Sequence, residues 1–351
     1  MVRSRMGRRA GRRPAAAAWI AVAGAAAIAL AVVVPVLDGR DAARPAVTPV
    51  AISPLSVAAA AGGAVPATAT TATTTPTSTG VPPKPTTTAT TKRPAAAPAR
   101  PKRPGPGTVQ FFTMSSGDGD GRRREFWVYR PGVPESSDLP VVYFLHGYPG
   151  SERTVADSGL ARTLEQLFAS GVRPFVVVAP NGESSTRGDT EWADSADGKV
   201  NLESYVVNRL VPAVEGAHRR DRAHRAVAGF SMGGFGAMNL GLRHPDLFGA
   251  IVSIAGYFRV DDPDGMGQNN PQWVTANSPD HHVAAGSGSR ILLVSASDEH
   301  DPLIVGEAQR YRRLAEAAGQ HSALVVAPGP HTFDLVVAQL PAVARFLAGG
   351  W

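Results

Sequence analysis

The residues from Gly229 to Gly233 read Gly-Phe-Ser-Met-Gly, which is the G-x-S-x-G spacing of a serine nucleophile held on a tight turn between a strand and a helix. That turn needs small residues two positions before and two positions after the serine, because a Cβ atom there would collide with the neighbouring chain. Gly229 and Gly233 meet this need, so the pattern predicts Ser231 as a nucleophile. A serine hydroxyl attacks poorly at neutral pH unless a histidine takes its proton and an acid orients that histidine.

Both partners are available downstream, on two loops that each follow an apolar run. The run 322–327 leads through a Gly/Pro loop into His331, which is the only one of the nine histidines in that position. The run 290–295 leads into three acids: Asp298, Glu299 and Asp301. The order is therefore nucleophile, acid, histidine, as in one of the known serine triads.

The negative charge that develops on the substrate oxygen must be held by backbone amides. The residue after the nucleophile, Met232, supplies one of them. The second is expected from the loop that follows an early strand, and the apolar run 139–145 is followed by such a loop at 146–150. We expect His146 to order this loop rather than to transfer protons.

Apolar runs and amphipathic stretches alternate along the chain around these loops. This alternation predicts an α/β fold with a mainly parallel, doubly wound sheet, a leading antiparallel hairpin, and a site at the carboxyl ends of the strands. The expected strands are 109–114, 125–129, 139–145, 174–179, 225–228, 290–295 and 322–327, and the expected helices are 160–170, 202–218, 234–242, 303–319 and 333–347.

From about residue 110 onward the chain resembles the esterase D branch of the α/β hydrolases, also called the "putative esterase" family. This family includes the mycobacterial mycolyltransferases and the enterochelin and feruloyl esterases. The resemblance rests on short motifs spread over the chain: His146-Gly147, Ala179-Pro180-Asn181, the elbow 229–234 with methionine after serine, Arg243-His244-Pro245, and 329–333. It implies an α/β-hydrolase fold and a catalytic triad. It also places the second oxyanion donor at the amide of Tyr148 and aligns the triad acid with Asp298. Many members have Gly-Thr-x-Asp where this chain has Ser-Ala-Ser-Asp, and Glu299 and Asp301 keep the choice of acid open.

Two tryptophans are candidates for contact with a substrate. Trp192 stands in a polar loop, and Trp273 stands in 259–288, a stretch with few apolar anchors that we expect to be an insertion over the site. His281 and His282 lie in the same stretch without carboxylates at ligand spacing, so no metal site is expected there, and no cofactor is expected for the chain.

The N-terminal third of the sequence has a different composition. Residues 1–13 contain six arginines, and residues 14–37 are uncharged and long enough to cross a bilayer as a helix. Residues 38–107 are rich in Ala, Pro and Thr and predict a disordered linker, whereas 108–351 form the catalytic domain. We expect a single-pass signal-anchor with the domain outside the cytoplasm. The alternative is a signal peptide that is cleaved to release a secreted protein.

Charge follows the same division. Residues 1–107 hold 14 Lys/Arg and 2 Asp/Glu, a net charge of +12, whereas residues 108–351 hold 21 and 27, a net charge of −6. The mildly acidic domain gives no reason to expect nucleic-acid binding. The expected partners are a small-molecule or cell-envelope ester and, through the N-terminal helix, a membrane, and the protein is expected to be a monomer. The chain contains no cysteine, so the domain has no disulfide and depends on its core.

Three functions are weighed for this pattern. The first is a serine esterase that hydrolyses carboxylic esters through an acyl-enzyme on Ser231. The second is an acyltransferase of the mycolyltransferase type, which passes the acyl group to a sugar or lipid alcohol. The third is a non-catalytic wall-associated domain, against which the intact Ser, Asp and His set argues.

Overall fold

The computed structural model describes residues 105–117, 121–133, 138–260, 262, 264–286 and 288–351. The predicted basic segment, the predicted anchor at 14–37 and the linker up to residue 104 lie outside the described residues. No helix in the described part is long and apolar enough to cross a membrane. The sequence predicted that the catalytic domain begins at residue 108. In the structure the first strand begins three residues earlier, at Gly105.

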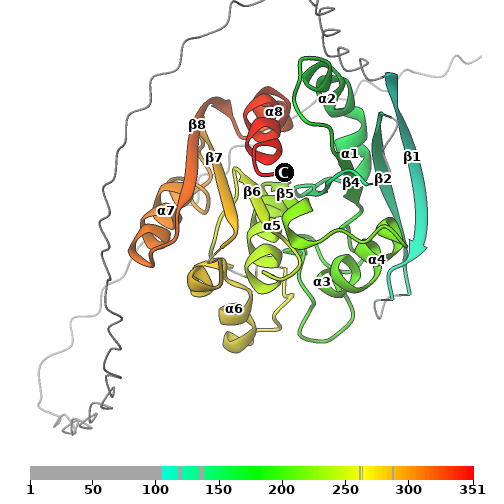
Figure 1. The fold of residues 1–351 in the computed structure, drawn as a ribbon. Coiled ribbons are helices and arrows are strands. Elements are labelled where there is room, and N and C mark those ends of the chain that lie inside the picture. The colour runs from blue at the N-terminus through cyan, green and yellow to red at the C-terminus, as the bar shows by residue number, and fades with distance from the viewer. Residues whose placement is uncertain (1–104, 118–120, 134–137, 261, 263, 287) are drawn as a thin grey trace, which may run out of the picture. The chain divides into compact units, whose positions relative to one another are not determined.

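Eight strands form one sheet in the order β1-β2-β4-β3-β5-β6-β7-β8 (Figure 1). The pairs β1–β2 and β2–β4 are antiparallel, and all the other pairs are parallel. This arrangement confirms the predicted mainly parallel sheet with a leading hairpin. The strands are β1 (Gly105–Ser115), β2 (Arg123–Gly132), β3 (Val141–Leu145), β4 (Val176–Pro180), β5 (Arg225–Phe230), β6 (Ala250–Ile254), β7 (Arg290–Asp298) and β8 (Ser322–Pro330).

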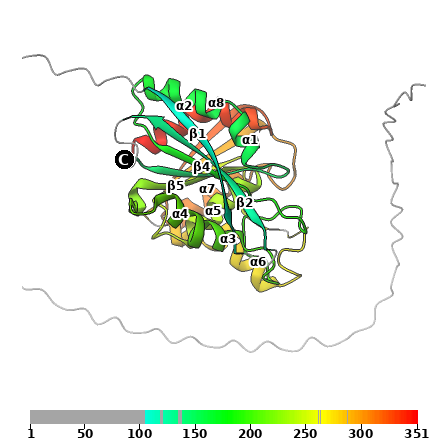
Figure 2. The same cartoon turned by 90° about the vertical axis from the view of Figure 1, so that its right-hand side faces the viewer.

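Helices cover both faces of the sheet, as Figure 2 shows. One face packs against α1 (Glu152–Asp157), α2 (Leu160–Ala169) and α8 (Phe333–Ala348). The other face packs against α3 (Leu202–Tyr205), α4 (Val211–Glu215), α5 (Met232–Arg243), α6 (Pro271–Asn277) and α7 (Glu307–Ala317). A π-helical turn at Val206–Leu210 joins α3 to α4, so the predicted helix 202–218 is one interrupted helical stretch.

The central strands are continuous apolar runs because both of their faces are covered. Every residue of β3, β4, β5 and β6 is buried. Along β3, Tyr143 and Leu145 enter the core beneath α5, whereas Val142 and Phe144 enter the core beneath α8. This two-sided burial fixes the register of the strands and therefore the positions of the loops at their carboxyl ends.

A buried ion pair closes the amino end of the sheet. Arg225, the first residue of β5, donates from Nε and Nη2 to the two carboxylate oxygens of Glu215, each over 2.7 Å. Tyr143 Oη donates to the same carboxylate over 3.1 Å. Burial raises the pKa of Glu215, but the hydrogen bonds and charge of Arg225, together with the hydrogen bonds from the Arg220 N–H and Tyr143, outweigh burial and the net pKa is lowered. Burial raises the pKa of Tyr143, so its hydroxyl stays protonated and remains a donor.

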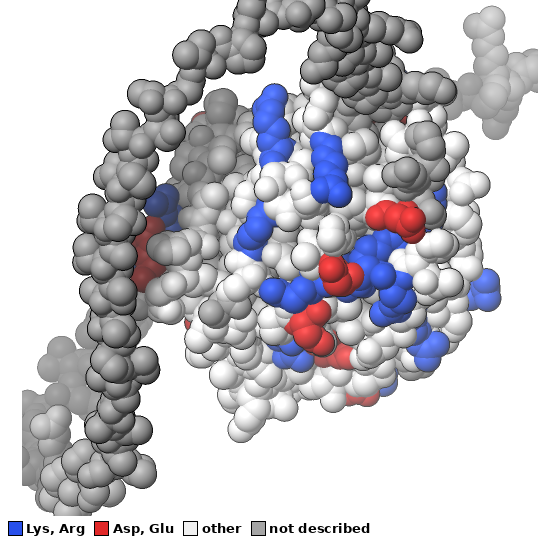
Figure 3. All heavy atoms as spheres, viewed as in Figure 1, with Lys and Arg blue, Asp and Glu red and all other residues white. Residues whose placement is uncertain are grey.

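The surface charge is mixed. On the face drawn in Figure 3, acidic and basic side chains of the described residues lie interspersed, and no broad surface of one sign is visible there.

Candidate active site

Ser231 occupies the turn between β5 and α5 in a left-handed backbone conformation, with φ 57° and ψ −121°. A residue other than glycine adopts such a conformation only when its surroundings impose it. Here the Ser231 N–H donates to the carbonyl of Ile254 over 2.9 Å, and the Ser231 carbonyl accepts from the N–H of Phe235 over 3.0 Å. The turn thus presents the Ser231 side chain at the carboxyl edge of the sheet.

The two glycines of the motif are required by the close approach of three backbone segments. A Cβ on Gly229 would lie 2.0 Å from the carbonyl oxygen of Gly233, and a Cβ on Gly233 would lie 2.0 Å from the carbonyl oxygen of Leu145. Neither contact can be relieved by a side-chain movement, because both involve backbone atoms. The structural reason predicted for these small residues is therefore confirmed.

His331 lies beside the serine, directly after β8. Its Nε2 is 2.9 Å from Ser231 Oγ, and its side chain is 25% exposed. The ring of Phe230 packs against the imidazole with a centroid distance of 4.9 Å. The structure therefore brings together the predicted nucleophile and the predicted base, from the ends of two different strands.

The acid that contacts this histidine is Glu299, so the prediction of Asp298 is wrong. Glu299 Oε2 lies 2.5 Å from Nδ1 of His331. Asp298 is the last residue of β7, is exposed, and accepts a hydrogen bond from the hydroxyl of its neighbour Ser297 over 2.8 Å. The pairing of β7 with β8 shifts register between Ala296 and Asp298, and such an irregularity changes the direction of the residues that follow.

The carboxylate of Glu299 is fixed by the turn on which it stands. Its Oε1 accepts from the N–H groups of His300 and Asp301, over 3.0 and 3.1 Å, and the side chain is only 6% exposed. The third candidate, Asp301, uses its own carboxylate to accept from the N–H of Leu303 over 2.9 Å. Asp301 therefore supports the local turn, whereas Glu299 faces the histidine.

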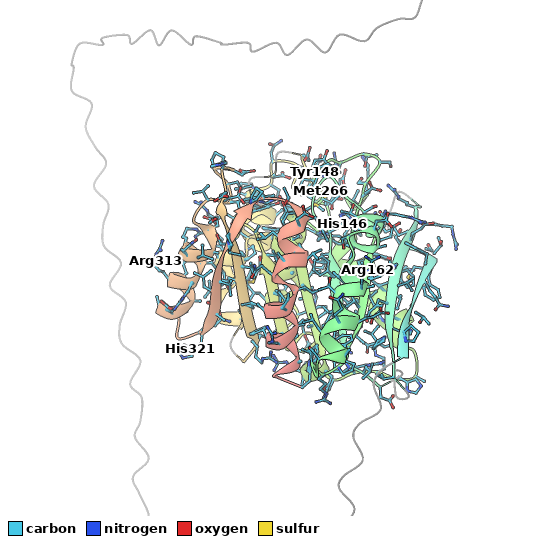
Figure 4. All side chains as sticks on the ribbon, turned by 90° about the horizontal axis from the view of Figure 1, so that it is seen from above. His146, Tyr148, Arg162, Met266, Arg313 and His321 are labelled. Atoms are coloured by element: carbon cyan, nitrogen blue, oxygen red, sulfur yellow. The ribbon has the colours of Figure 1, made fainter. Side chains whose placement is uncertain are left out.

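The predicted oxyanion donors border a small cavity beside the serine. Tyr148 and Met232 line this cavity of about 130 Å³, together with residues of the loop after β4. Met232 is the first residue of α5, where the helix leaves N–H groups without helical partners. A Cβ on Gly147 would lie 3.0 Å from Cβ of Ser231, so the loop passes directly over the nucleophile. Figure 4 shows Tyr148 and His146 at one end of the molecule and His321, which precedes β8, at the other.

His146 is buried and orders this loop, as predicted. Its Nε2 accepts from the N–H of Gly182 over 2.8 Å, so the ring proton is on Nδ1, which donates to the carbonyl of Gly147 over 2.9 Å. Burial lowers the pKa of His146 to about 4. The ring is therefore neutral at physiological pH and connects two loops by hydrogen bonds.

Trp192, a predicted substrate contact, does not line the cavity beside Ser231. Its side chain is completely buried, and its indole N–H donates to the carbonyl of His146 over 3.0 Å. The ring also meets the imidazole of His146 edge to face, with centroids 5.0 Å apart. Trp192 therefore supports the loop over the serine from inside the core.

Trp273, the other predicted substrate contact, does not line that cavity either. It is buried on α6, and its indole N–H donates to the carbonyl of Asp194 over 2.7 Å. It borders a polar cavity with Arg243 and His244, which stand at the C-terminal end of α5. Ser231 precedes the N-terminal end of that helix, about 18 Å away along twelve residues at 1.5 Å each.

The histidines of the segment 259–288 have other partners. His282 Nε2 lies 2.8 Å from the carbonyl oxygen of Ala276, and His281 Nε2 lies 3.8 Å from a carboxylate oxygen of Asp280. Within the described part of the chain, no three His, Cys, Asp or Glu side chains converge as a metal site.

Comparison with known proteins agrees with this geometry. The profile of the family described as "Putative esterase" matches residues 119–347. Among curated proteins, the chain is 34% identical over 128 residues to the "Putative esterase NocK" of Nocardia uniformis subsp. tsuyamanensis, covering 36% of this chain and 35% of that protein. It is 27% identical over 236 residues to the esterase Rv1288 of Mycobacterium tuberculosis, covering 55% of this chain and 49% of that protein. The chain thus spans about half or less of the length of these relatives.

Solved structures share the fold. A ferulic acid esterase superposes with a TM-score of 0.62 at 23% identity, covering 70% of this chain and 99% of that one. An identity this low shows a common fold, here the α/β-hydrolase fold.

Proposed function

Because this chain belongs to the "Putative esterase" family, we propose that its folded part is a serine esterase that hydrolyses carboxylic esters through an acyl-enzyme on Ser231. The observation that carries the proposal is the unbroken series of contacts from Ser231 Oγ to His331 Nε2 and from His331 Nδ1 to Glu299. A nucleophile, a base and an orienting acid in this geometry suit acyl transfer.

The proposed first half-reaction forms the acyl-enzyme. Ser231 Oγ attacks the ester carbonyl carbon while His331 Nε2 takes the hydroxyl proton. Glu299 accepts the hydrogen bond from Nδ1–H and stabilises the imidazolium ion that results. The C–O bond of the ester then breaks, and His331 returns the proton to the departing alcohol oxygen.

The second half-reaction repeats these steps with water. His331 takes a proton from the water, the hydroxide oxygen bonds to the acyl carbon, and the bond to Ser231 Oγ breaks with return of the proton to the serine. In both halves the amides of Met232 and Tyr148 stabilise the negative oxygen of the tetrahedral intermediate.

We also propose that the domain works outside the cytoplasm. The support for this placement is the sequence before the fold, where six arginines precede the uncharged run 14–37.

The test uses a fluorophosphonate probe and a short-chain 4-nitrophenyl ester. The wild-type protein should be labelled at Ser231 and should release the acid. Ser231→Ala should lose labelling and reduce turnover by about 10⁴-fold or more while its circular dichroism stays unchanged. A wild-type protein that is folded but neither labelled nor active would contradict the proposal. Addition of a sugar or lipid alcohol separates hydrolysis from transfer, because transfer yields a new ester in place of the free acid.

A further inference from the structure

The cavity beside Tyr148 and Met232 has a defined position relative to the reacting atoms. In the tetrahedral intermediate, one oxygen faces the amides of those two residues, and the leaving oxygen must face His331 Nε2 to receive its proton. The acyl chain, which is the remaining substituent of the carbon attached to Ser231 Oγ, must therefore point away from His331. The cavity is lined by the loop over the serine and by the loop after β4, and neither His331 nor Glu299 borders it. It therefore lies on the acyl side of the site.

The size of the cavity limits what it can enclose. Its volume is about 130 Å³, which is below the ~150 Å³ of an apolar cavity known to hold one benzene molecule. A group of about five non-hydrogen atoms fills such a space. A cinnamoyl group, with a ring and a linker, or a long alkyl chain exceeds this volume and would have to extend out of the cavity into solvent.

The lining of the cavity is polar, whereas a pocket that binds alkyl chains would have an apolar lining. The loop after β4 contributes the side chains of Arg187, Glu183 and Ser184. Among the described residues, the guanidinium of Arg187 bonds only to Asp197, through Nη2 over 2.8 Å, and its buried Nε has no partner. A guanidinium has five N–H donors, so this side chain keeps hydrogen-bonding capacity that the described part of the protein does not use.

The cavity is bordered by charges of both signs, and Asp197 is shared by Arg187 and Lys199. Arg187 faces Asp197, and the Glu183 carboxylate lies 3.7 Å from Arg122 Nη2. An anionic group in the cavity would face the Glu183 carboxylate, and a cationic group would face the Arg187 guanidinium. A neutral hydroxyl suits the site better, because it can accept from Arg187 and donate to the Glu183 carboxylate.

We propose that this cavity is the acyl pocket of the enzyme and that it selects a short acyl group bearing a hydroxyl, which Arg187 binds. The inference rests on the proposed esterase function and deepens it by naming the acyl group. It sets this chain apart from the ferulic acid esterase that shares its fold, because an aromatic acyl group exceeds the pocket.

The experiment compares 4-nitrophenyl esters that differ only in the acyl group. The central pair is 3-hydroxybutyrate and 3-methylbutyrate, which have nearly the same shape and differ by a hydroxyl in place of a methyl group. We expect the wild-type kcat/KM to favour 3-hydroxybutyrate about tenfold, as one hydrogen bond to a charged group allows. Butyrate should be hydrolysed faster than octanoate and faster than cinnamate.

Two variants with matched charge loss assign the effect to Arg187. Arg187→Met keeps an unbranched aliphatic stem but removes the guanidinium and its donors, and should bring the tenfold ratio to within about twofold of unity. Lys199→Met removes the other cation that pairs with Asp197, at 3.3 Å, and Lys199 does not border the pocket. It should leave the ratio unchanged. Circular dichroism and the rate with 4-nitrophenyl acetate show whether each variant is folded and competent.

The outcomes separate this inference from the proposed function. A wild type that hydrolyses octanoate or cinnamate faster than butyrate, or that does not distinguish the isosteric pair, overturns the acyl-pocket assignment while the esterase stands. A ratio that survives in Arg187→Met overturns the role of Arg187. If the wild type neither reacts with the fluorophosphonate nor hydrolyses any ester, the proposed function fails, and this inference fails with it.

Discussion

Two glutamates whose side chains are largely covered lie at opposite ends of the sheet and have basic partners but different uses. At the amino end, Glu215 binds Arg225 through two hydrogen bonds of 2.7 Å. At the carboxyl end, Glu299 lies 2.5 Å from His331. The difference lies in the base. Arg225 is 3% exposed and its guanidinium acts only as a donor, whereas His331 is 25% exposed and has a second ring nitrogen that faces Ser231.

The same strand links the two regions. β5 begins at Arg225 and ends at Phe230, one residue before the left-handed turn at Ser231. The amino end of the strand is held by a closed network with no opening to solvent around Glu215, whose side chain is 0% exposed. A strained turn is sustained only when its surroundings over-determine it. The comparison indicates that the two ends of β5 have separate roles: the amino end stabilises the fold, and the carboxyl end presents the nucleophile in its strained turn.

The largest expected effect concerns Glu299. Glu299→Gln removes the charge that stabilises the imidazolium ion and should reduce kcat on a short-chain ester by about 10⁴-fold, with little loss of stability. Asp298→Asn should stay within about threefold of wild type, because its carboxylate contacts only Ser297 among the described side chains. Steady-state kinetics of the two variants, with Asp301→Asn as a further control, measure the difference. A larger loss in Asp298→Asn than in Glu299→Gln would show that the acid is misassigned.

The reciprocal change is Glu215→Gln. Removing this charge leaves Arg225 buried without a counter-ion, so the free energy of unfolding should fall by about 3–5 kcal/mol. The kcat of the molecules that remain folded should be unchanged, because Glu215 lies at the opposite end of β5 from Ser231. Urea unfolding gives the first quantity, and active-site titration with the fluorophosphonate followed by kinetics gives the second. If kcat per titrated site falls together with stability, the two ends of β5 are not independent.

His146, at the carboxyl end of the sheet, should make the stability of the folded protein depend on pH. Its pKa is about 4 in the folded protein, against 6.5 for an ordinary histidine, so between these pH values the unfolded chain binds one more proton than the folded protein. The stability from neutral His146 is complete above pH 6.5 and is lost as the pH falls toward 4, by up to about 3 kcal/mol. Urea unfolding at pH 7, 5.5 and 4.5 measures this loss. The variant His146→Gln cannot titrate there and should show a shallower pH dependence; equal slopes would contradict the assignment.

The smallest expected effect comes from removing residues 1–104. Neither region of the comparison includes them, and β1 starts at Gly105. The shortened protein should keep the same kcat on small esters and should lose the same amount of stability as the pH falls. The cut must not extend to residue 107, because the Gly107 N–H donates to Glu165 over 2.9 Å and Gly105 pairs with Gly132. A shortened protein with altered kcat would show that the N-terminal residues take part in the site.

The sequence predicted those features of the fold and site that depend on local patterns of residues. The G-x-S-x-G turn, the strands that run into His331 and Glu299, and the alternation of helices and strands all depend on residues close in the chain. β6 (Ala250–Ile254) was missed because a run of five residues, four of them apolar, does not distinguish a strand from a buried helix.

The errors at the site have a different origin. Whether Trp192 faces solvent or the core depends on loops and on β3, which are far away in the chain. The choice between Asp298 and Glu299 depends on how β7 pairs with β8, which spacing alone does not encode. Arg187, the polar side chain of the proposed acyl pocket, lies in an irregular loop, and no sequence motif marked it as a site residue.

The outer strand β1 has a consequence for how the protein can be handled at high concentration. Its eleven residues contain no charged side chain, and Val109, Phe111 and Phe112 are exposed by 40% or more. Natural sheets usually protect such an edge with lysine, proline or a bulge, because an unprotected edge accepts a strand from another molecule. Here the irregular pairing between Gly105 and Thr108 protects only the start of the strand. We therefore expect self-association through β1 at high concentration, and a lysine in the second half of the strand is the substitution that should reduce it.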